Sequence, residues 1–464
     1  MSAPSPARPS RVRYGVLAMV CALSMITYID RACFGVAAPS IAAELGLTDV
    51  SELKWAMTAF AIAYAVFEIP AGALGDRMGP RALLLRIVLW WSACTALTGV
   101  VGLRVGGVAL GGLGTLVTLR FLFGAGEAGA YPNITRALHN WLPTRSWETA
   151  QGMVFMSGRL MGGLTPLLWA FLVGGAAGST GFVTWRGAFI LFGAFGVVWA
   201  LVFALWFRDR PDDHPKVNDA ERALIASEWR GRGSHSAVPW RALATSRSLW
   251  ALCVMYCSVN YAWAFNMTYL PAYIQERFML AEGDKLGALY KGMPLWVGAA
   301  GCLLGGLSVN GLARILDDRR LARRTLGVVA LSAGAACWWG AVRAENIHQF
   351  CILISLAAFT IDLTLGAAWA TCQDLGREHA AVTAACMNTI GTLGSALAGW
   401  LTGTLVERSL AAAVQVGGAL SASEKRLAVL SGYDAAFATY IAVFILAAAC
   451  WLLIDPRKPI GARE

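Results

Sequence analysis

The sequence predicts an all-α polytopic membrane protein, with twelve transmembrane helices in two six-helix repeats and both termini in the cytoplasm. Of its 464 residues, 57% are hydrophobic and 14% are charged, whereas soluble domains carry about 25% charged residues. The apolar residues form repeated runs of roughly 20, the length that spans a bilayer as a helix. A long polar segment near the middle of the chain separates two sets of such runs.

Each expected span is an apolar run bounded by charged or turn-forming residues. The first run is kept as a span rather than a cleaved signal peptide, because it carries Asp30 and Arg31 in its interior and further spans follow it. The expected spans are 14–40, 55–75, 82–102, 112–134, 148–173, 187–207, 249–274, 290–311, 325–342, 347–373, 380–405 and 433–454.

Basic residues indicate the orientation of these spans. With the N-terminus inside, the cytoplasmic loops and termini hold 25 Lys and Arg, the outer loops hold 10, and three lie within spans. Loops rich in Lys and Arg stay on the cytoplasmic side, so we expect both termini inside. The net charge of +10 is attributed to these loops, and nucleic acid is not an expected partner.

A polar segment divides the chain into two halves. Residues 208–247 contain three Pro and alternating charges, which predicts a solvated cytoplasmic linker with one short amphipathic helix over 218–230. We therefore expect an N-terminal six-helix bundle over 1–207 and a C-terminal six-helix bundle over 248–464.

The two halves also repeat selected residues at a nearly constant offset. Gly72 matches Gly306, Gly158 matches Gly391, and Glu127 matches Asp362, with separations of 233 to 235 residues. Parallel repeats of this kind place a substrate site between the halves, near the middle of the membrane.

Cysteine and histidine residues give no indication of a metal site. Most of the eleven Cys lie in apolar stretches, no CxxC is present, and the five His fall at loops or helix ends. The segment GAGEAG from Gly124 to Gly129 matches GxGxxG, but it lies inside an apolar helix and contains Glu127, which is not the context of a dinucleotide site. We expect no metal and no cofactor.

The turn between the second and third spans reads GALGDRMGPR, from Gly72 to Arg81. Gly72 permits a close turn, Asp76 can cap the next helix or pair across the loop, and Arg77 and Arg81 are expected to face the cytoplasm. This segment resembles GxxxDRxGxR, the loop signature of the major facilitator superfamily.

That resemblance implies a gating latch. Asp76 would join a charge network with Arg136 at the inner end of the fourth span, and the network would hold the outward-open state. In the C-terminal copy, GLSVNGLAR, Asn310 stands where an acid is often found, which puts the second latch in doubt.

Other segments, in order along about residues 14–460, resemble the anion:cation symporter family, which includes carriers of galactonate, hexuronate and glucarate. They include YIDRACFGVAAPSI in the first span, RFLFGAGEAGAYPNITRALHNWLP in the fourth, GRLMGGLTPLL in the fifth, DLTLGAAWA in the tenth, and the terminal WLLIDPRKP. The resemblance implies the major facilitator fold.

Charged residues inside the spans are the candidates for function, because a charge at the bilayer centre costs about 2.5–3.5 kcal/mol and normally faces a partner or a wet cavity. Asp30 and Arg31 are adjacent, hence about 100° apart on a helix, and cannot neutralise each other face to face. Arg120 and Glu127 are seven residues apart, so they share a face at about 10 Å, too far for a fixed pair. They can bracket a small anion, or Arg120 can set the pKa of Glu127.

By resemblance, Arg31 matches the position that holds the substrate carboxylate, and Asp30 and Glu127 match positions proposed to carry protons. Structural salt bridges between helices are the alternative role for these charges and for Arg120. The polar and aromatic residues that match positions lining the sugar-acid site are Tyr28, Tyr64, Trp369 and Asn388.

Arg159 in the fifth span has two open roles. It lies among Gly158, Gly162 and Gly163, and it can add a second anion contact or extend toward the membrane interface. Two further acids, Glu68 and Asp362, lie in spans and have no assigned role.

The resemblance implies a secondary active transporter that moves a small organic anion, such as a hexuronate or an aldonate, with protons by alternating access. We expect a multi-pass monomer in the lipid bilayer of a bacterial inner membrane. Alternatives within transport are another carboxylate, aromatic or dicarboxylic, or coupling to sodium. A membrane ligand sensor is the alternative outside transport, although a complete loop motif and a short linker count against it. No nucleophile–base pair appears, so an enzyme is not expected.

Overall fold

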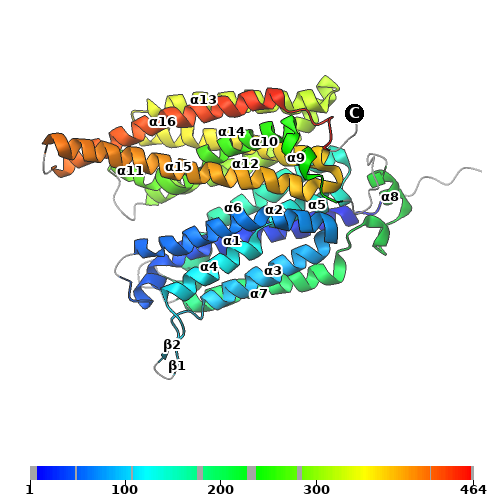
Figure 1. Cartoon of the computed structure of the whole chain (residues 1–464), viewed down its shortest axis with the longest axis horizontal. Coiled ribbons are helices and arrows are strands. Elements are labelled where there is room, and N and C mark those ends of the chain that lie inside the picture. Colours follow the sequence, from blue (N-terminus) through cyan, green and yellow to red (C-terminus); the bar gives the residue numbers. More distant parts are fainter. Residues whose placement is uncertain are drawn as a thin grey trace, which may run out of the picture. The chain divides into compact units, whose positions relative to one another are not determined.

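The structure is a computed structural model that describes residues 8–47, 50–105, 108–174, 181–226, 237–279, 285–417 and 420–460. These residues are almost entirely helical, and the chain divides into two compact units (Figure 1). Unit 1 comprises Met1–Trp240 and Cys372–Cys386, and unit 2 comprises Arg241–Thr371 and Met387–Glu464.

Unit 1 is built mainly from long apolar helices that run beside one another (Figure 1). Helix α1 packs against α6, α2 against α4, and α3 against α7. Several helix starts follow from the sequence: Pro80 is the first residue of α3, and the Thr184 side chain caps α7 by accepting the Gly187 N–H. The helices are α1 (Val12–Glu44), α2 (Lys54–Met78), α3 (Pro80–Thr98), α4 (Leu113–Glu127), α5 (Ala130–Trp141), α6 (Trp147–Val173), α7 (Trp185–Trp206) and α8 (Asp219–Ala226).

The fourth expected span, over 112–134, is not one continuous helix. Helix α4 ends at Glu127, and α5 begins at Ala130 after Gly129, which has a left-handed φ of 86°. A Cβ atom at Gly129 would also lie 2.4 Å from the Ala71 Cβ, so both the backbone conformation and the close approach of α2 require glycine. The expectation of an uninterrupted helix was wrong because the apolar pattern continues through this break.

The third expected span, over 82–102, is also shorter than predicted at its end. Helix α3 stops at Thr98, and a small antiparallel hairpin follows, with β1 (Arg104–Val105) paired to β2 (Val108–Ala109). The sequence analysis did not predict these strands.

The first part of the polar linker belongs to unit 1 and contacts the start of α1. The expected helix over 218–230 is present as α8, and residues 227–230 lie outside the described residues. The buried Glu221 carboxylate on α8 accepts the backbone N–H groups of Val12 and Arg13 and binds the Arg13 guanidinium at 2.8 Å. It therefore caps the N-terminus of α1, where a negative charge is stabilised by the helix dipole.

Unit 2 is also helical. Ser246 caps α10, Asp318 caps α13, and Ser421 and Glu424 form a capping box at α16. A short π-helix, Phe265–Tyr269, joins α10 to α11. The helices are α9 (Trp240–Thr245), α10 (Arg247–Ala264), α11 (Leu270–Phe278), α12 (Lys285–Leu316), α13 (Arg319–Val342), α14 (Ile347–Gly376), α15 (Ala380–Gly417) and α16 (Ala422–Leu453), of which α14 ends in unit 1 and α15 begins there.

The two units repeat a packing detail. In unit 1, a Cβ atom at Gly158 of α6 would lie 2.6 Å from Ser24 Oγ and 2.6 Å from the Tyr28 ring on α1. In unit 2, a Cβ atom at Gly391 of α15 would lie 2.5 Å from the Tyr256 ring on α10. These glycines have corresponding positions in the two halves of the sequence, and small residues allow such close approach between membrane helices.

Ten helical stretches within the described residues are long and apolar enough to cross a membrane. The break at Gly129 leaves α4 and α5 too short to count, and α14 and α15 are counted as one stretch, Ile347–Gln415. The structure thus has about ten to twelve apolar helices. The total of twelve and the cytoplasmic location of the termini stay predictions.

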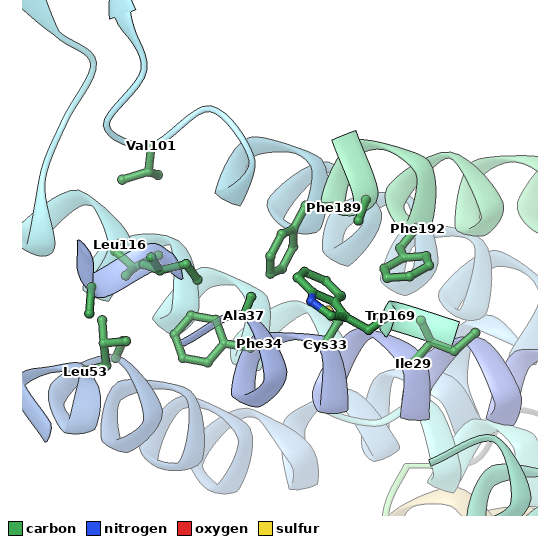
Figure 2. Close-up of a cluster of buried hydrophobic side chains, with 14 residues drawn as sticks. Ile29, Cys33, Phe34, Ala37, Leu53, Val101, Leu116, Trp169, Phe189 and Phe192 are labelled. Atoms are coloured by element: carbon green, nitrogen blue, oxygen red, sulfur yellow. The ribbon is translucent and has the colours of Figure 1, made fainter. Parts of the chain in front are cut away.

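A buried apolar cluster covers the face of α1 that carries Cys33, Phe34 and Ala37. Figure 2 shows Cys33, Phe34 and Ala37 of α1 with Trp169 of α6 and Phe189 of α7. The Trp169 and Phe189 rings pack edge to face at 6.0 Å between centroids. Lipid is as apolar as these side chains, so close packing rather than exclusion of water stabilises this contact. It holds α1 in one rotational setting, and Asp30 and Arg31 have fixed positions as a result.

Candidate functional site

The central feature of unit 1 is an ion pair between α1 and α4. The Arg31 Nε donates to Glu127 Oε1 at 2.6 Å. A third of the Arg31 side chain, 33%, is exposed, whereas the Glu127 side chain is 1% exposed. Glu127 Oε2 has no hydrogen-bond partner within the described part of the chain. Arg31 therefore keeps donor groups accessible while one oxygen of Glu127 neutralises it.

The sequence analysis placed Arg120 on the same helix face as Glu127, about 10 Å away, and did not pair Glu127 with Arg31. Arg120 instead lies over aromatic rings, with its Cζ 4.2 Å from the Phe34 centroid and 4.6 Å from the Phe123 centroid. It is buried, and its Nε has no hydrogen-bond partner among the described residues. Cation–π contacts of this kind stabilise a desolvated guanidinium by about 2 kcal/mol. Sequence spacing could not show this, since the rings come from two helices.

Asp30 lies beside this pair but does not join it. Its side chain is buried, and neither carboxylate oxygen makes a hydrogen bond within the described residues. The charged groups that interact electrostatically with Asp30 are Glu127 and Arg120. Arg31 thus pairs with Glu127 and not with the adjacent Asp30. This agrees with the angle of about 100° between neighbouring residues on a helix.

Aromatic rings lie close to the Arg31 guanidinium. Its Cζ lies 4.9 Å from the Tyr64 ring centroid, and Tyr28 and Tyr131 are near enough to interact with it electrostatically. Tyr28 accepts a hydrogen bond from Arg159 Nη1 at 3.1 Å. These contacts bring four of the predicted site residues, together with Glu127, to one region of unit 1.

Tyr131 lies in the same region and was not identified by the sequence analysis. Its hydroxyl is 3.0 Å from Ser24 Oγ, and its ring stacks on Phe155 at 5.1 Å. It stands four residues after Glu127. The available signal was its place in the same apolar segment as Glu127.

The other two predicted substrate contacts belong to unit 2. Trp369 is buried, and its Nε1 donates to the Tyr256 hydroxyl at 3.1 Å. Asn388 is half-buried near the start of the unit 2 part of α15. Their role in binding the same anion stays a prediction.

The predicted latch residue Asp76 lies at the C-terminal end of α2. Its carboxylate accepts the backbone N–H groups of Ala381 at 3.2 Å and Val382 at 2.9 Å, in the first turn of α15. Arg136 Nε is 3.7 Å from Asp76 Oδ1. One carboxylate thus binds both the positive end of a helix dipole and a guanidinium.

Gly72 and Arg136 complete these contacts. A Cβ atom at Gly72 would lie 2.7 Å from Ala385 Cβ and 2.9 Å from the Ala381 carbonyl oxygen. Glycine therefore lets α2 meet the start of α15. Arg136 Nη1 also donates to the Arg377 carbonyl at 2.8 Å.

The two remaining Arg residues of the loop motif differ from each other. Arg77 is exposed, as expected. Arg81 is half-buried: its backbone N–H donates to Asp209 Oδ1 at 2.8 Å, and its guanidinium donates to the Ala204 carbonyl at 2.6 Å. Arg81 therefore connects the start of α3 with the end of α7 directly, and with Asp209 just after α7. The sequence analysis did not identify Asp209.

The degraded second copy of the motif shows a weaker contact in unit 2. Asn310 Oδ1 accepts from Arg319 Nη2 at 3.5 Å. This contact pairs a charge with a neutral amide, in contrast to the Asp76–Arg136 pair in unit 1.

Comparison with known proteins identifies the fold and the family. The sequence model of the Major Facilitator Superfamily matches residues 20–399. The fold resembles the proton:xylose symporter XylE, with a TM-score of 0.73, 11% identity and 97% of each chain covered. It also resembles the human organic anion transporter MFSD10, with a TM-score of 0.66, 12% identity, and 95% and 100% of the two chains covered.

The chain is 32% identical over 405 residues to a probable sulfoacetate transporter of Cupriavidus necator, covering 86% of this chain and 88% of the relative. It is 26% identical over 392 residues to a probable L-galactonate transporter of Escherichia coli, covering 83% and 80%. It is 27% identical over 408 residues to a probable galactarate/D-glucarate transporter of Bacillus subtilis, covering 84% of each. These relatives are transporters and not enzymes, and this chain belongs to the major facilitator superfamily, in its anion:cation symporter family.

Proposed function

We propose that this protein is a secondary active transporter that carries a small organic anion together with protons by alternating access. The observation that supports this most strongly is the Arg31–Glu127 pair at 2.6 Å, in which the partly exposed cation is neutralised by a buried acid. A pair of this kind inside a membrane span offers two states: with Glu127 ionised the cation is satisfied, and with Glu127 protonated it needs another anion.

The coupling follows from competition for Arg31. A proton on Glu127, or on the neighbouring Asp30, removes a negative charge from the site and frees the Arg31 guanidinium. The substrate carboxylate then takes the place of the Glu127 carboxylate, because the guanidinium fork matches two carboxylate oxygens. The loaded site carries the same net charge as the empty, ionised site.

Alternating access completes the cycle. The two six-helix halves rock about the bound anion, the site opens to the cytoplasm, and anion and proton leave. The empty carrier returns with Asp30 and Glu127 ionised and with Arg31 paired again. Asp76, which binds the start of α15 and Arg136, is proposed to stabilise the outward-open state in this cycle.

The proposed substrate is a small organic acid, and a sugar acid such as a hexuronate or an aldonate is the first candidate. The names of the relatives support this class, since they include probable carriers of sulfoacetate, L-galactonate and galactarate or D-glucarate. Tyr28, Tyr64, Trp369 and Asn388 are proposed to contact the polar groups of the substrate. We place the protein as a monomer in a bacterial inner membrane with both termini in the cytoplasm.

Uptake into proteoliposomes tests this proposal. Purified protein is reconstituted and given radiolabelled D-galactonate, D-glucuronate or sulfoacetate under an inward proton gradient, an inward sodium gradient, or no gradient. The proposal predicts accumulation of at least one of these anions under the proton gradient, and its collapse with a protonophore. Accumulation driven by sodium alone would contradict proton coupling, and no movement of any small organic anion would contradict the substrate class.

A further inference from the structure

The proposed cycle leaves the Glu127 carboxyl without its partner during part of each turnover. Arg31 holds that carboxylate at 2.6 Å through Oε1, and Oε2 has no hydrogen-bond partner in the described part of the chain. When the transported anion takes Arg31, the contact with Oε1 is lost as well. The position of the Glu127 carboxyl then depends on the backbone that carries it.

That backbone is the end of a helix. Glu127 is the last residue of α4, and the chain turns at Gly129 before α5 begins at Ala130. The last four carbonyl groups of a helix have no partner within it, and the final turn of a helix frays readily. Contacts from neighbouring helices are therefore needed to fix the position of Glu127.

Trp90 on α3 makes such a contact. Its indole Nε1 donates to the Leu122 carbonyl, in the last two turns of α4, at 2.8 Å. The ring also lies against Gly126, the residue before Glu127: a Cβ atom at Gly126 would overlap Trp90 Cδ1 and lie 2.8 Å from Nε1. Trp90 thus holds the end of α4 by a hydrogen bond at one residue and by ring packing at another.

The other two glycines at non-adjacent positions of the GAGEAG segment pack the same stretch against α2. A Cβ atom at Gly124 would overlap the Phe60 carbonyl oxygen, and one at Gly129 would overlap the Ala71 side chain. Small residues allow this close approach between membrane helices. The segment that matches a dinucleotide motif in sequence is therefore a packing device, and Glu127 lies within it.

A simpler role for the Trp90 hydrogen bond is to satisfy the indole N–H, because a polar group in a membrane span needs an acceptor. Trp90 is 49% exposed and lies in the middle of α3, so this need is real. It does not explain the fit of the ring against Gly126, beside the acid. The two roles differ in what happens when the N–H is removed and an aromatic ring is kept.

We infer that Trp90 is a positioning residue for Glu127, and that its contacts with the end of α4 keep the carboxyl where Arg31 can pair with it again in the empty carrier. This inference rests on the proposed function and adds a residue to its coupling step. The Arg31–Glu127 pair forms in the empty carrier of the proposed cycle. Loss of the Trp90 contact therefore slows the return of the empty carrier and leaves the steps with bound anion nearly unchanged.

Two assays in proteoliposomes separate these steps, with labelled D-galactonate, D-glucuronate or sulfoacetate as the anion. Accumulation under an inward proton gradient requires the empty carrier to return, whereas counterflow does not. Trp90→Phe keeps a ring near Gly126 and removes the indole N–H. It should lower gradient-driven accumulation about three- to tenfold, as for the loss of one hydrogen bond, and keep counterflow within about twofold of wild type.

Trp250→Phe is the matched control for this variant. Trp250 is 50% exposed, and its Nε1 donates to the Ala244 carbonyl at 2.7 Å, in unit 2. The substitution therefore removes the same kind of hydrogen bond from a Trp of the same exposure. It should match wild type in both assays.

Gly126→Ala tests the same contact from α4, because the added methyl group overlaps the Trp90 ring. It should lower gradient-driven accumulation and keep counterflow, as Trp90→Phe does. Gly114→Ala is its control on the same helix, where the methyl group meets open space among the described residues, and it should match wild type. Monodisperse elution and an unchanged Tm establish that each variant is folded.

Wild-type accumulation in folded Trp90→Phe overturns the inference. An equal loss of accumulation and counterflow also overturns it, because a purely structural role lowers both. Either result leaves proton-coupled transport by the wild-type protein in place. If Trp90→Phe does not fold, Gly126→Ala decides by the same criteria. If the wild-type protein accumulates none of the three anions under the proton gradient, the proposed function fails and the inference fails with it.

Discussion

Arg31 is the residue on which anion binding depends in this account. Its guanidinium is held by Glu127 at 2.6 Å and lies over the Tyr64 ring. The sequence identified both charged residues, because charges within apolar spans are rare and conspicuous. It did not identify their pairing, since Arg31 is on α1 and Glu127 is at the end of α4, and the pairing depends on how these helices meet.

The first prediction concerns Arg31→Lys. Lysine keeps the charge but loses the planar fork that binds two oxygens, so affinity for the transported anion should fall roughly 10- to 100-fold, as for the loss of one charge-assisted hydrogen bond. Titration calorimetry on the purified variant measures this loss. Arg343→Lys, at an exposed position, is the control. Wild-type affinity in a folded Arg31→Lys protein would remove Arg31 from the binding site.

The loop motif, the break after Glu127 and the contact of Arg81 with Asp209 determine how the helices of unit 1 meet. The sequence indicated the first of them clearly and the other two poorly. The loop motif from Gly72 to Arg81 was evident, because its glycines and charges follow a distinct pattern. The break after Glu127 was not, since only Gly129, with a φ of 86°, departs from a continuous apolar run. Asp209 was missed because its partner, the Arg81 backbone N–H, is distant in sequence.

The second prediction belongs to the element formed by α2 and the start of α15. Asp76→Asn removes the charge that binds two N–H groups of α15 and the Arg136 guanidinium. Transport should slow several-fold, while substrate affinity should stay within about a factor of two, because the change biases a two-state equilibrium and removes no ligand contact. Initial uptake rates and equilibrium binding on the same preparation measure both. A loss of affinity as large as that of Arg31→Lys would contradict the latch role.

The linker supplies a third, pH-dependent prediction. His214 is buried between the rings of Trp141 and Trp206, at 5.7 and 4.9 Å between centroids, and its Nδ1 accepts the Lys216 N–H. Burial lowers the pKa of His214, and the nearby charges of Arg208 and Lys216 lower it further, against opposing effects of a hydrogen bond with the Trp206 backbone and of Glu221. The folded protein therefore binds this proton less readily than the unfolded chain does.

The sign of the effect follows from linkage. The stability that His214 contributes is complete above its unfolded pKa of about 6.5 and declines as the pH falls below it. Thermal unfolding at pH 8 and pH 5.5 should show a drop in Tm on the acid side for the wild-type protein, and a smaller drop for His214→Phe, which cannot take up the proton. Equal drops in the two proteins would show that His214 makes no contribution to the pH dependence.

At the scale of the whole molecule, composition and periodicity predicted a polytopic helical membrane protein, and the motif resemblance predicted the major facilitator fold. The match to the superfamily over residues 20–399 and the TM-score of 0.73 to a proton:xylose symporter confirm the major facilitator fold. The correspondence of Gly158 and Gly391 also survives in three dimensions, since each admits a ring from a neighbouring helix of its own unit. The sequence was informative here because a single glycine in each of these helix pairs lets an aromatic ring of one helix pack against the backbone of the other.

The contacts of the charged site residues could be predicted from the sequence less well than the fold. Arg120 shows the reason: its spacing from Glu127 left open a bracket for an anion or an effect on the pKa of Glu127, and neither interpretation indicated that its guanidinium lies over Phe34 and Phe123. Helical spacing reports which residues share a face on one helix. It does not report which side chains a neighbouring helix brings to that face.

The central claim is that Glu127 couples the proton to the anion, and Glu127→Gln tests it most directly. Glutamine has the shape and neutrality of the protonated acid, so substrate binding should survive, but it has no proton to release. In proteoliposomes, uptake driven by an inward proton gradient should be abolished, while counterflow without a gradient should remain, because exchange needs no return of the empty carrier. Glu345→Gln, at an exposed position, should behave as wild type in both assays. If Glu127→Gln still concentrates the anion under the proton gradient, the claim is contradicted, and Asp30 becomes the residue to examine.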